Sequence, residues 1–372
     1  MNRNSLLFRK TAGCLMGGAV GDAFGGPLEC MHYRMIREYH GGRVEEMLPY
    51  RRPEDFFQPG HLAYSLNGEA GSFTDDTRLQ LLISRAIAEK GGRIDADDLA
   101  DFWMRNMDVK AFWFSVSGGF HRIAMSDTPV RQAGAGNISE NSAPMCIGPV
   151  GVINAGNPAQ AALDAYDLIS LSHDGVAREA AACLAAAVAE AMRPGTDVHA
   201  VVKAAIRFTP NRETSPMPQL IERAADLARR ARNAEELTQT YYEQLNVKWF
   251  KRSKQAYQRP RDDERFSPSC DVRESVPVVM GMFLLCGGDF RQTIVSTANY
   301  GRDCDTTACM AGYLAGAFQG LDAIPADWVE KVEKANPEAD LLQISEGVAR
   351  ALSNERRRMQ NLYQMIERME ET

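Results

Sequence analysis

The sequence of 372 residues has few features of a disulfide-stabilised or zinc-binding protein. Its eight cysteines include no CxxC pair, and its six histidines include no pair with the HExxH spacing. Scattered cysteines favour reduced thiols over a disulfide framework, and a zinc site is not expected. Lysine and arginine number 42 against 49 acidic residues, a net charge of -7. This balance disfavours nucleic acid or an anionic membrane as the main partner.

A long apolar run is also missing. Residues 1–10 are polar and basic, so no secretory signal is expected. The small and apolar stretch 12–20 is soon interrupted by Asp22, far short of the roughly 20 apolar residues that span a bilayer. We therefore expect a cytoplasmic protein without a membrane segment.

Strand-like alternation is scarce, there is no internal repeat, and helical periodicity dominates. Pro158 and Pro277 fall near expected helix starts, where proline is tolerated. With 45% hydrophobic residues the chain can form a large core, and we expect an all-α single domain over residues 1–372. Helices are predicted over 94–107, 157–170, 175–192, 198–208, 217–231, 274–285 and about 341–369.

Two acidic groups share a layout although they lie more than two hundred residues apart. They are Thr74-Asp75-Asp76 and Asp303-Cys304-Asp305, the latter followed by Thr306. Apolar residues at helical spacing follow the first group over 79–87, and a helix-like run follows the second over 308–317. Each group is therefore predicted to lie at a helix N-terminus.

Aspartates at a helix start often only cap free amide groups and complement the helix dipole. Here each group holds two aspartates beside a threonine, which is more carboxylate than a cap requires. Mg²⁺ and Mn²⁺ prefer carboxylate, hydroxyl and water oxygens. If the fold brings the two helix starts together, the groups would hold two cations roughly 3.5–4 Å apart. We therefore favour a binuclear metal site over simple capping.

Small residues recur at helical spacing in two segments. Glycines lie four apart at Gly13, Gly17 and Gly21, and residues 308–317 offer a face of alanine and glycine. Such faces let another backbone approach closely. Close packing of the first helix would place Asp22 and Glu29 at a cleft.

Three segments together carry a resemblance to a known family. They are Gly-Asp-x-x-Gly-x-x-x-Glu at residues 21–29, Thr-Asp-Asp-Thr at 74–77, and Asp-x-Asp-Thr at 303–306. In this order and separation, the chain resembles the ADP-ribosylglycohydrolase family. The resemblance implies an orthogonal helical bundle with two Mg²⁺ or Mn²⁺ ions in a central cleft. It also implies hydrolysis of the N- or O-glycosidic bond between ADP-ribose and an acceptor.

The resemblance also implies roles for individual residues. Thr74, Asp75 and Asp76 would bind one metal ion, Asp303 and Thr306 the other, and Asp305 would bridge them. The catalytic candidates are Glu29, Asp76 and Asp305. The alternative for Glu29 is a surface glutamate that follows a Gly-Pro turn.

The chain departs from the family in two places. Arg302 stands where many relatives have glycine, and it would either contact a phosphate or neutralise a neighbouring carboxylate. The glycine-rich loop 134–146 lacks the arginine that often follows it in relatives, and it would either bind a diphosphate or serve as a connection. The substrate-binding candidates are Asn141, Ser142, Met145, His173 and Arg302.

His173 falls where the family has a histidine near the adenosine end of the ligand. It would either contact that ligand or play a structural part, with Ser172 or Asp174 capping the helix that follows.

Two further segments leave alternatives open. Residues 241–270 mix basic and aromatic side chains, and we expect an irregular segment there. It would serve as a substrate lid, a solvated loop or a nucleic-acid site. The nucleic-acid site is the least favoured of the three because the chain as a whole is acidic. The amphipathic helix at about 341–369 carries Arg356, Arg357 and Arg358 and would pack on the body or mediate self-association. The oligomeric state is left open.

The leading hypothesis is a metal-dependent ADP-ribosyl hydrolase acting on an ADP-ribosylated protein or small-molecule acceptor. A second keeps the metals but takes a free nucleoside, nucleotide or ADP-ribose conjugate. The third is a noncatalytic ADP-ribose-binding descendant, comparable to the lens crystallin branch of the family.

Overall fold

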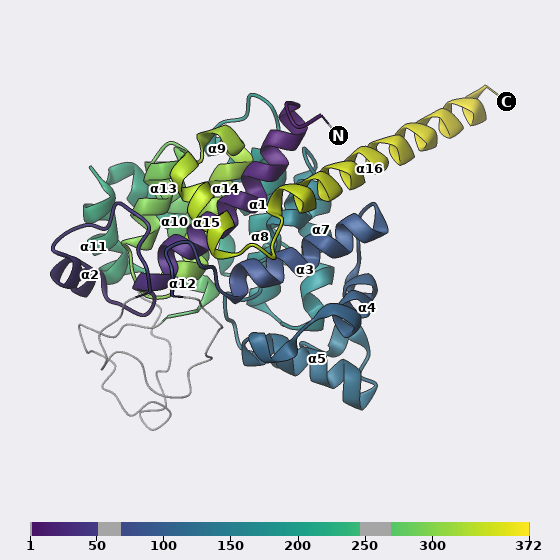
Figure 1. Ribbon diagram of the computed structural model, residues 1–372. Helices are drawn as coiled ribbons and strands as arrows, with labels where there is room; N and C mark the ends of the chain where they lie inside the picture. Colours follow the sequence, from purple (N-terminus) through teal and green to yellow (C-terminus); the bar gives the residue numbers. More distant parts are fainter. Residues whose placement is uncertain (1, 51–67, 246–268, 372) are drawn as a thin grey trace.

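The computed structural model describes residues 2–50, 68–245 and 269–371. In these ranges every regular element is a helix, and strand-like pairing is limited to two isolated bridges, His32 with Gly301 and Glu140 with Asp271. The α-helices are α1 (Leu6–Gly25), α2 (Tyr33–His40), α3 (Asp75–Lys90), α4 (Ala96–Asn106), α5 (Phe114–Ser126), α6 (Gly148–Ile153), α7 (Pro158–Leu168), α8 (Val176–Ala191), α9 (Val198–Arg207), α10 (Met217–Arg230), α11 (Ala234–Gln244), α12 (Val272–Leu285), α13 (Phe290–Ala298), α14 (Cys304–Gln319), α15 (Ala326–Ala335) and α16 (Leu341–Glu370). Short 3₁₀ turns are η1 (Gly26–Leu28), η2 (Val109–Ala111), η3 (Val130–Gln132), η4 (Ile169–Leu171) and η5 (Leu321–Ala323). The all-α prediction is confirmed (Figure 1).

The predicted helices lie within two residues of the observed bounds of α4, α7, α8, α9, α10, α12 and α16. One detail differs. α12 begins at Val272, where the side chain of Asp271 accepts a hydrogen bond from the Arg273 backbone N–H at 2.9 Å. This earlier start places Pro277 inside the helix and not near its beginning.

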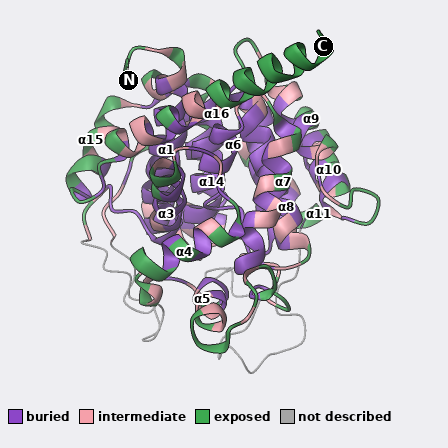
Figure 2. Cartoon of the chain, turned by 90° about the vertical axis from the view of Figure 1, so that its right-hand side faces the viewer, coloured by how far each residue is buried: buried purple, intermediate pink, exposed green. Residues whose placement is uncertain are grey.

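The buried centre of the fold is built on α1 and α14, which lie among other buried helices in Figure 2. A Cβ atom at Gly17 would overlap the carbonyl oxygen of Gly312, and one at Gly21 would overlap that of Ala308. Gly13 lies in the same way against Gly316. The two backbones therefore touch along their length, which confirms the close approach predicted for both small-residue faces.

A buried lysine ties the start of α1 to the ends of two other helices. The ammonium group of Lys10 donates hydrogen bonds to the carbonyl oxygens of Ala191 (2.6 Å), Ala317 and Phe318 (both 2.9 Å). These carbonyls belong to the last turns of α8 and α14, where helix dipoles favour a cation. Burial lowers the pKa of Lys10 to about 8.

The C-terminal helix is buried only in its first half. Leu341, Val348 and Ala351 are buried against the body, and from residue 356 onward every described residue of α16 is exposed. In Figure 1 this second half projects away from the other helices. None of the described helices is long and apolar enough to cross a membrane.

The segment 241–270 begins as the last turn of α11. The side chain of Tyr241 is buried, and its hydroxyl donates to the carbonyl oxygen of Ala224 at 2.9 Å. Residues 246–268 lie outside the described part of the chain, so the lid, loop and nucleic-acid interpretations stay predictions.

Candidate active site

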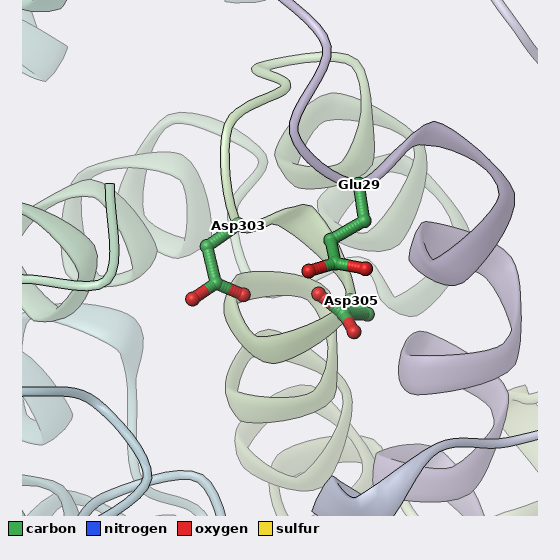
Figure 3. A group of neighbouring side chains, drawn as sticks. All are labelled: Glu29, Asp303 and Asp305. Atoms are coloured by element: carbon green, nitrogen blue, oxygen red, sulfur yellow. The ribbon is translucent and has the colours of Figure 1, made fainter. Parts of the chain in front are cut away.

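Three carboxylates meet where the loop after α1 reaches the start of α14 (Figure 3). Each of Glu29, Asp303 and Asp305 offers an oxygen atom, and these oxygens lie within 4.8 Å of one another. Glu29 and Asp303 are half-buried, and Asp305 is buried. Such an arrangement could hold a cation.

Glu29 is positioned by the main chain on its C-terminal side. The backbone N–H of Cys30 donates to the carbonyl of Arg302, and the N–H of Arg302 donates to the carbonyl of Met31 at 2.7 Å. Cys30 and Arg302 both have positive φ, 64° and 59°, a conformation that non-glycine residues rarely adopt. Together with the contact between α1 and α14, this pairing fixes Glu29 beside Asp303 and Asp305.

The first acidic group joins the same site from α3. The Thr74 side chain caps α3 by accepting from the Asp76 N–H at 3.3 Å. The hydroxyl groups of Thr74 and Thr306 lie 3.2 Å and 3.4 Å from Asp76 Oδ2. Asp75 is also close, since its charge contributes to the raised pKa of Asp76. The structure thus brings the two acidic groups together, while their roles as metal ligands stay predictions.

Asp22 is buried against Thr74 and Thr77, whereas the sequence predicts a position at a cleft. Its carboxylate is fully buried and accepts hydrogen bonds from the Thr74 N–H (3.0 Å), the Thr77 N–H (3.0 Å) and the Thr77 hydroxyl (2.6 Å). The residue therefore fastens the first turn of α3 to α1. The glycines before Asp22 explain its depth, because α1 sinks into the core against α14.

Burial and mutual repulsion shift the acidity of the aspartates. Burial raises the pKa of Asp303 to about 6, and the nearby charge of Glu29 adds to this effect. Burial also raises the pKa of Asp305 and of Asp76 well above the ordinary value, with further contributions from neighbouring carboxylates. Without a cation, these groups hold protons because like charges cannot all ionise together.

Two oxygen atoms of the cluster are buried and have no hydrogen-bond partner among the described residues. They are Oδ1 of Asp76 and Oδ1 of Asp305. A buried oxygen without a partner costs free energy, so native proteins usually supply one. Both atoms belong to carboxylates of the predicted metal set, and a divalent cation would satisfy them.

The predicted substrate residues fall into two environments. Asn141 reaches the acidic cluster, because its amide nitrogen donates to Asp303 Oδ2 at 3.1 Å. Ser142 instead enters a buried polar network, 2.8 Å from Glu140 Oε1 and 2.9 Å from His173 Nε2. Met145 is buried in the hydrophobic core.

His173 is only 1% exposed, and Ser172 Oγ lies 2.9 Å from its second ring nitrogen. Both ring nitrogens therefore have partners within the protein, an arrangement that favours the structural alternative for this histidine. Its predicted contact with a ligand remains a prediction. Asp174 accepts from the backbone N–H of Gly175 at 2.7 Å, next to the start of α8.

Arg302 contacts a carboxylate, which agrees with the alternative that it neutralises a neighbouring acidic group. Its Nε lies 3.0 Å from Glu274 Oε1, and its guanidinium carbon lies 4.4 Å from the ring centroid of Tyr242. The hydroxyl of Tyr300 and that of Ser269 also donate to Glu274. Arg302 thus belongs to a buried ion pair beside the site, and its phosphate contact stays a prediction.

Sequence reasoning missed the two buried glutamates Glu140 and Glu274. Each contacts a residue next to the acidic cluster. Glu140 accepts a hydrogen bond from Ser142, and Glu274 forms an ion pair with Arg302. Glu274 was visible only as one residue of a predicted helix, and Glu140 as one polar residue of a loop. Nothing in their local spacing indicates burial, which results from contacts with distant segments.

The fold and site define an all-α protein with a cluster of carboxylates between the ends of α1, α3 and α14. The family model for ADP-ribosylglycohydrolase matches residues 3–361. The chain therefore belongs to the ADP-ribosylglycohydrolase family.

Individual relatives are distant. The chain is 23% identical over 333 residues to the ADP-ribosyl-[dinitrogen reductase] glycohydrolase of Rhodospirillum rubrum, covering 87% of this chain and 90% of the relative. It is 34% identical to the human ADP-ribosylhydrolase ARH3 over 79 residues, 18% of this chain and 22% of that protein. A solved structure of an ADP-ribosylglycohydrolase-related protein complex is similar in fold, with a TM-score of 0.58, 21% identity, and coverage of 93% of this chain and 97% of that chain.

Proposed function

We propose that this protein is a divalent-cation-dependent hydrolase that cleaves the glycosidic bond between ADP-ribose and an acceptor. Membership of the ADP-ribosylglycohydrolase family supports hydrolysis of an ADP-ribose linkage. The observation that carries the proposal is the convergence of Glu29, Asp303 and Asp305 next to Asp76. These residues come from segments far apart in the sequence, and a purely structural role would not require so many carboxylates in one place.

The side chains present fit Mg²⁺ or Mn²⁺. Carboxylate and hydroxyl oxygens are the donors that these hard cations prefer. We assign Thr74, Asp75 and Asp76 to one cation, Asp303 and Thr306 to a second, and Asp305 to both. The two buried oxygens without partners, on Asp76 and Asp305, support this assignment. Bound cations would polarise substrate oxygens and help to orient water.

Glu29 is the candidate for proton transfer. Its carboxylate faces Asp303 and Asp305 (Figure 3). Because Glu29 is only half-buried, we infer that it can also reach a group that enters from solvent. A glycosidic bond breaks more readily when the leaving group gains a proton, and water attacks more readily when it loses one. Glu29 would hold and transfer a proton in either step, while Asp76 and Asp305 would contribute through the cations that they hold.

Asn141 positions Asp303 in this scheme. Its side-chain amide donates to Asp303 Oδ2, leaving the other carboxylate oxygen for the cluster. Ser142, Met145, His173 and Arg302 remain proposed contacts for the ADP-ribose part of the substrate. The proposed substrate is an ADP-ribosylated protein or small molecule. The name of the Rhodospirillum rubrum relative gives a protein, dinitrogen reductase, as the acceptor for that enzyme.

The test is release of free ADP-ribose from a panel of substrates that carry ADP-ribose on arginine, on serine or on a small molecule. Each is incubated with Mg²⁺, with Mn²⁺ or with a chelator. We expect turnover of at least one substrate with a cation and its loss with the chelator. Tight binding of ADP-ribose by calorimetry without turnover of any substrate would favour the noncatalytic alternative, and cleavage only of free nucleosides or nucleotides would favour the second hypothesis.

A further inference from the structure

The exposed half of α16 carries large apolar side chains that the body of the protein does not cover. They are between 42% and 69% exposed, and we call them the apolar stripe: Met359, Leu362, Tyr363, Met365, Ile366 and Met369. The other large side chains of this part of the helix are polar or charged. Single exposed apolar residues are ordinary, but six of them within the exposed half of α16 indicate an interaction surface.

The stripe has the spacing of a two-helix interface. Met359, Leu362, Ile366 and Met369 follow one another at intervals of three, four and three residues. This is the pattern of core positions in a coiled coil, in which each side chain fits between side chains of a facing helix. Tyr363 and Met365 widen the stripe on its two sides. One amphipathic helix of the same kind is therefore a matching partner.

The free energy of the helix also favours a partner. Residues 356–370 extend about 22 Å beyond the body at 1.5 Å per residue, and a helix of about this length is marginal in water without packing. Pairing two copies along the stripe would cover apolar surface on six large side chains of each copy, and hydrophobic burial is the main favourable term in most protein–protein association.

Charges on this half of α16 are separated along its length. Arg356, Arg357 and Arg358 lie near the body next to Glu355, whereas Glu367, Glu370 and Glu371 lie toward the tip together with Arg368. Arg356 and Glu370 flank the core positions on the same side of the helix, two heptads apart. In a parallel pair they would stay apart, whereas in an antiparallel pair Arg356 of each copy lies near Glu370 of the other, so this charge pair favours the antiparallel direction.

We propose that two copies of this chain associate through antiparallel pairing of their α16 helices along the apolar stripe. When the core positions of the two antiparallel helices are aligned, Met359 lies opposite Met369 of the second copy, and Leu362 lies opposite Ile366 of the second copy. The same register brings Arg356 next to Glu370 of the second copy, and the symmetry of the pair repeats each contact. Arg356 and Glu370 form no ion pair among the residues that the structure describes.

An anionic membrane is a poorer match for the same helix. From Glu355 to Glu371 the chain carries four arginines and four glutamates, and 4 - 4 gives no net charge. Helices that lie on membranes usually carry a strongly basic polar face that attracts anionic lipids. The neutral and separated charges of α16 suit a copy of itself instead.

The pairing also fixes the shape of the dimer. Ala351 is the last buried residue of α16, and in the proposed register the Ala351 positions of the two copies lie about 40 Å apart along the helices. The two bodies therefore sit at opposite ends of a helical bridge and do not overlap. The acidic site is remote from the bridge and stays accessible in both copies.

Sedimentation equilibrium of the full-length protein across a wide range of concentrations tests the proposal. The wild type should interconvert between monomer and dimer, and Ile366→Glu should weaken the dimer by at least about tenfold. Gln364→Glu, which adds the same charge outside the stripe, should leave the dimer unchanged. At a concentration at which the wild type is monomeric, a thermal melt should match between all three proteins, because these side chains lie outside the folded body.

A charge exchange tests the direction of pairing. Arg356→Glu and Glu370→Arg should each weaken the dimer several-fold, and the double variant should restore it, since the ion pair is re-formed with its charges exchanged. Small-angle scattering should give an elongated dimer. A wild type that stays monomeric, an Ile366→Glu protein as dimeric as the wild type, or a double variant weaker than both single ones would each overturn the proposal. Uptake of monomers by anionic vesicles would assign the stripe to lipid and also overturn it.

Discussion

The carboxylate of Asp22 on α1 accepts hydrogen bonds from both the backbone N–H (3.0 Å) and the hydroxyl (2.6 Å) of Thr77 on α3. The same carboxylate also accepts a hydrogen bond from the backbone N–H of Thr74, the residue that caps α3. Three donors from one helix start thus share a single buried carboxylate. The residue holds the α3 aspartates in place, and its charge adds to the effect of burial in raising the pKa of Asp76.

Replacement of Asp22 should therefore destabilise the protein more than loss of an ordinary helix cap. Asp22→Ala leaves buried donors on Thr74 and Thr77 without an acceptor, and we expect the free energy of unfolding to fall by about 3 kcal/mol or more. Asp289→Ala is the matched control, because Asp289 is exposed and caps α13 through one bond to Gln292. That change should cost about 1 kcal/mol. Equal losses in urea unfolding would show that Asp22 is only a cap.

The contact between α1 and α14 predicts a strong effect of a single methyl group. Gly21→Ala would place a Cβ atom on the carbonyl oxygen of Ala308, so the helices must separate, and we expect a loss of about 1–3 kcal/mol or more in stability. Gly118→Ala in α5 is the control, because a Cβ atom there meets open space. It should stabilise the protein by up to about 1 kcal/mol. Thermal melts of both variants check this contrast.

Asp305 should link cation binding to stability. A cation that binds only the folded protein raises its melting temperature, and Asp305→Ala removes a carboxylate from the centre of the proposed metal set. We expect Mg²⁺ to raise the melting temperature of the wild type and of Asp174→Ala, and to have a much smaller effect on Asp305→Ala. Asp174 bonds only backbone N–H groups in its own neighbourhood. Equal shifts in all three proteins would contradict the assignment of Asp305.

Glu29 should affect the rate more than binding. Glu29→Gln keeps the size of the side chain but removes its acid–base function, so single-turnover hydrolysis should slow about 100-fold or more. Calorimetric titration with ADP-ribose should give nearly the same affinity as in the wild type. Undiminished hydrolysis would mean that Glu29 is a bystander, and an equal loss of binding would mean that it serves the ligand and not the reaction.

The raised pKa values of the buried aspartates predict an unusual dependence of stability on pH. In the cation-free protein, the pKa of Asp303 rises from an ordinary value of 3.8 to about 6. Between these values the folded state binds more protons than the unfolded state, so this group's contribution to the free energy of unfolding falls as pH rises from about 4 to 6. Cations replace the protons, so the stabilisation by Mg²⁺ should be larger at pH 7.5 than at pH 5.

Urea unfolding in chelator at these two pH values, and again with Mg²⁺, measures both effects. Asp303→Asn should reduce the pH dependence in chelator, because the substituted side chain does not titrate. A wild type and an Asp303→Asn variant with the same pH dependence would show that Asp303 ionises normally.

Much of the helical frame could be predicted from the sequence because its signals are local. The bounds of α8 and α16 follow from apolar periodicity, and the N-terminal position of the two acidic groups follows from the helices after them. The small-residue spacing of α1 likewise predicts a close neighbour. The small-residue faces of both α1 and α14 are visible in the sequence, but the sequence does not show that these two helices pack against each other.

The surroundings of the site were harder to predict because they depend on contacts between distant segments. Asp22 looked like a member of the cleft, and only the depth of α1 shows that it is enclosed by α3. The sequence leaves both a ligand contact and a structural role open for His173, and two serine hydroxyls within 2.9 Å of its ring nitrogens favour the structural role. Charge and spacing indicated that carboxylates gather, but the partner of each carboxylate is set by tertiary structure.

The contact between α1 and α14 has a consequence for the order in which the protein can mature during synthesis. Glu29 leaves the ribosome early, but its neighbours Asp303 and Asp305 follow more than 270 residues later. Until α14 has been made, the glycine face of α1 has no backbone to lie against, and the site does not exist. A nascent chain should therefore gain its cation affinity abruptly, near the end of translation and not gradually as helices accumulate.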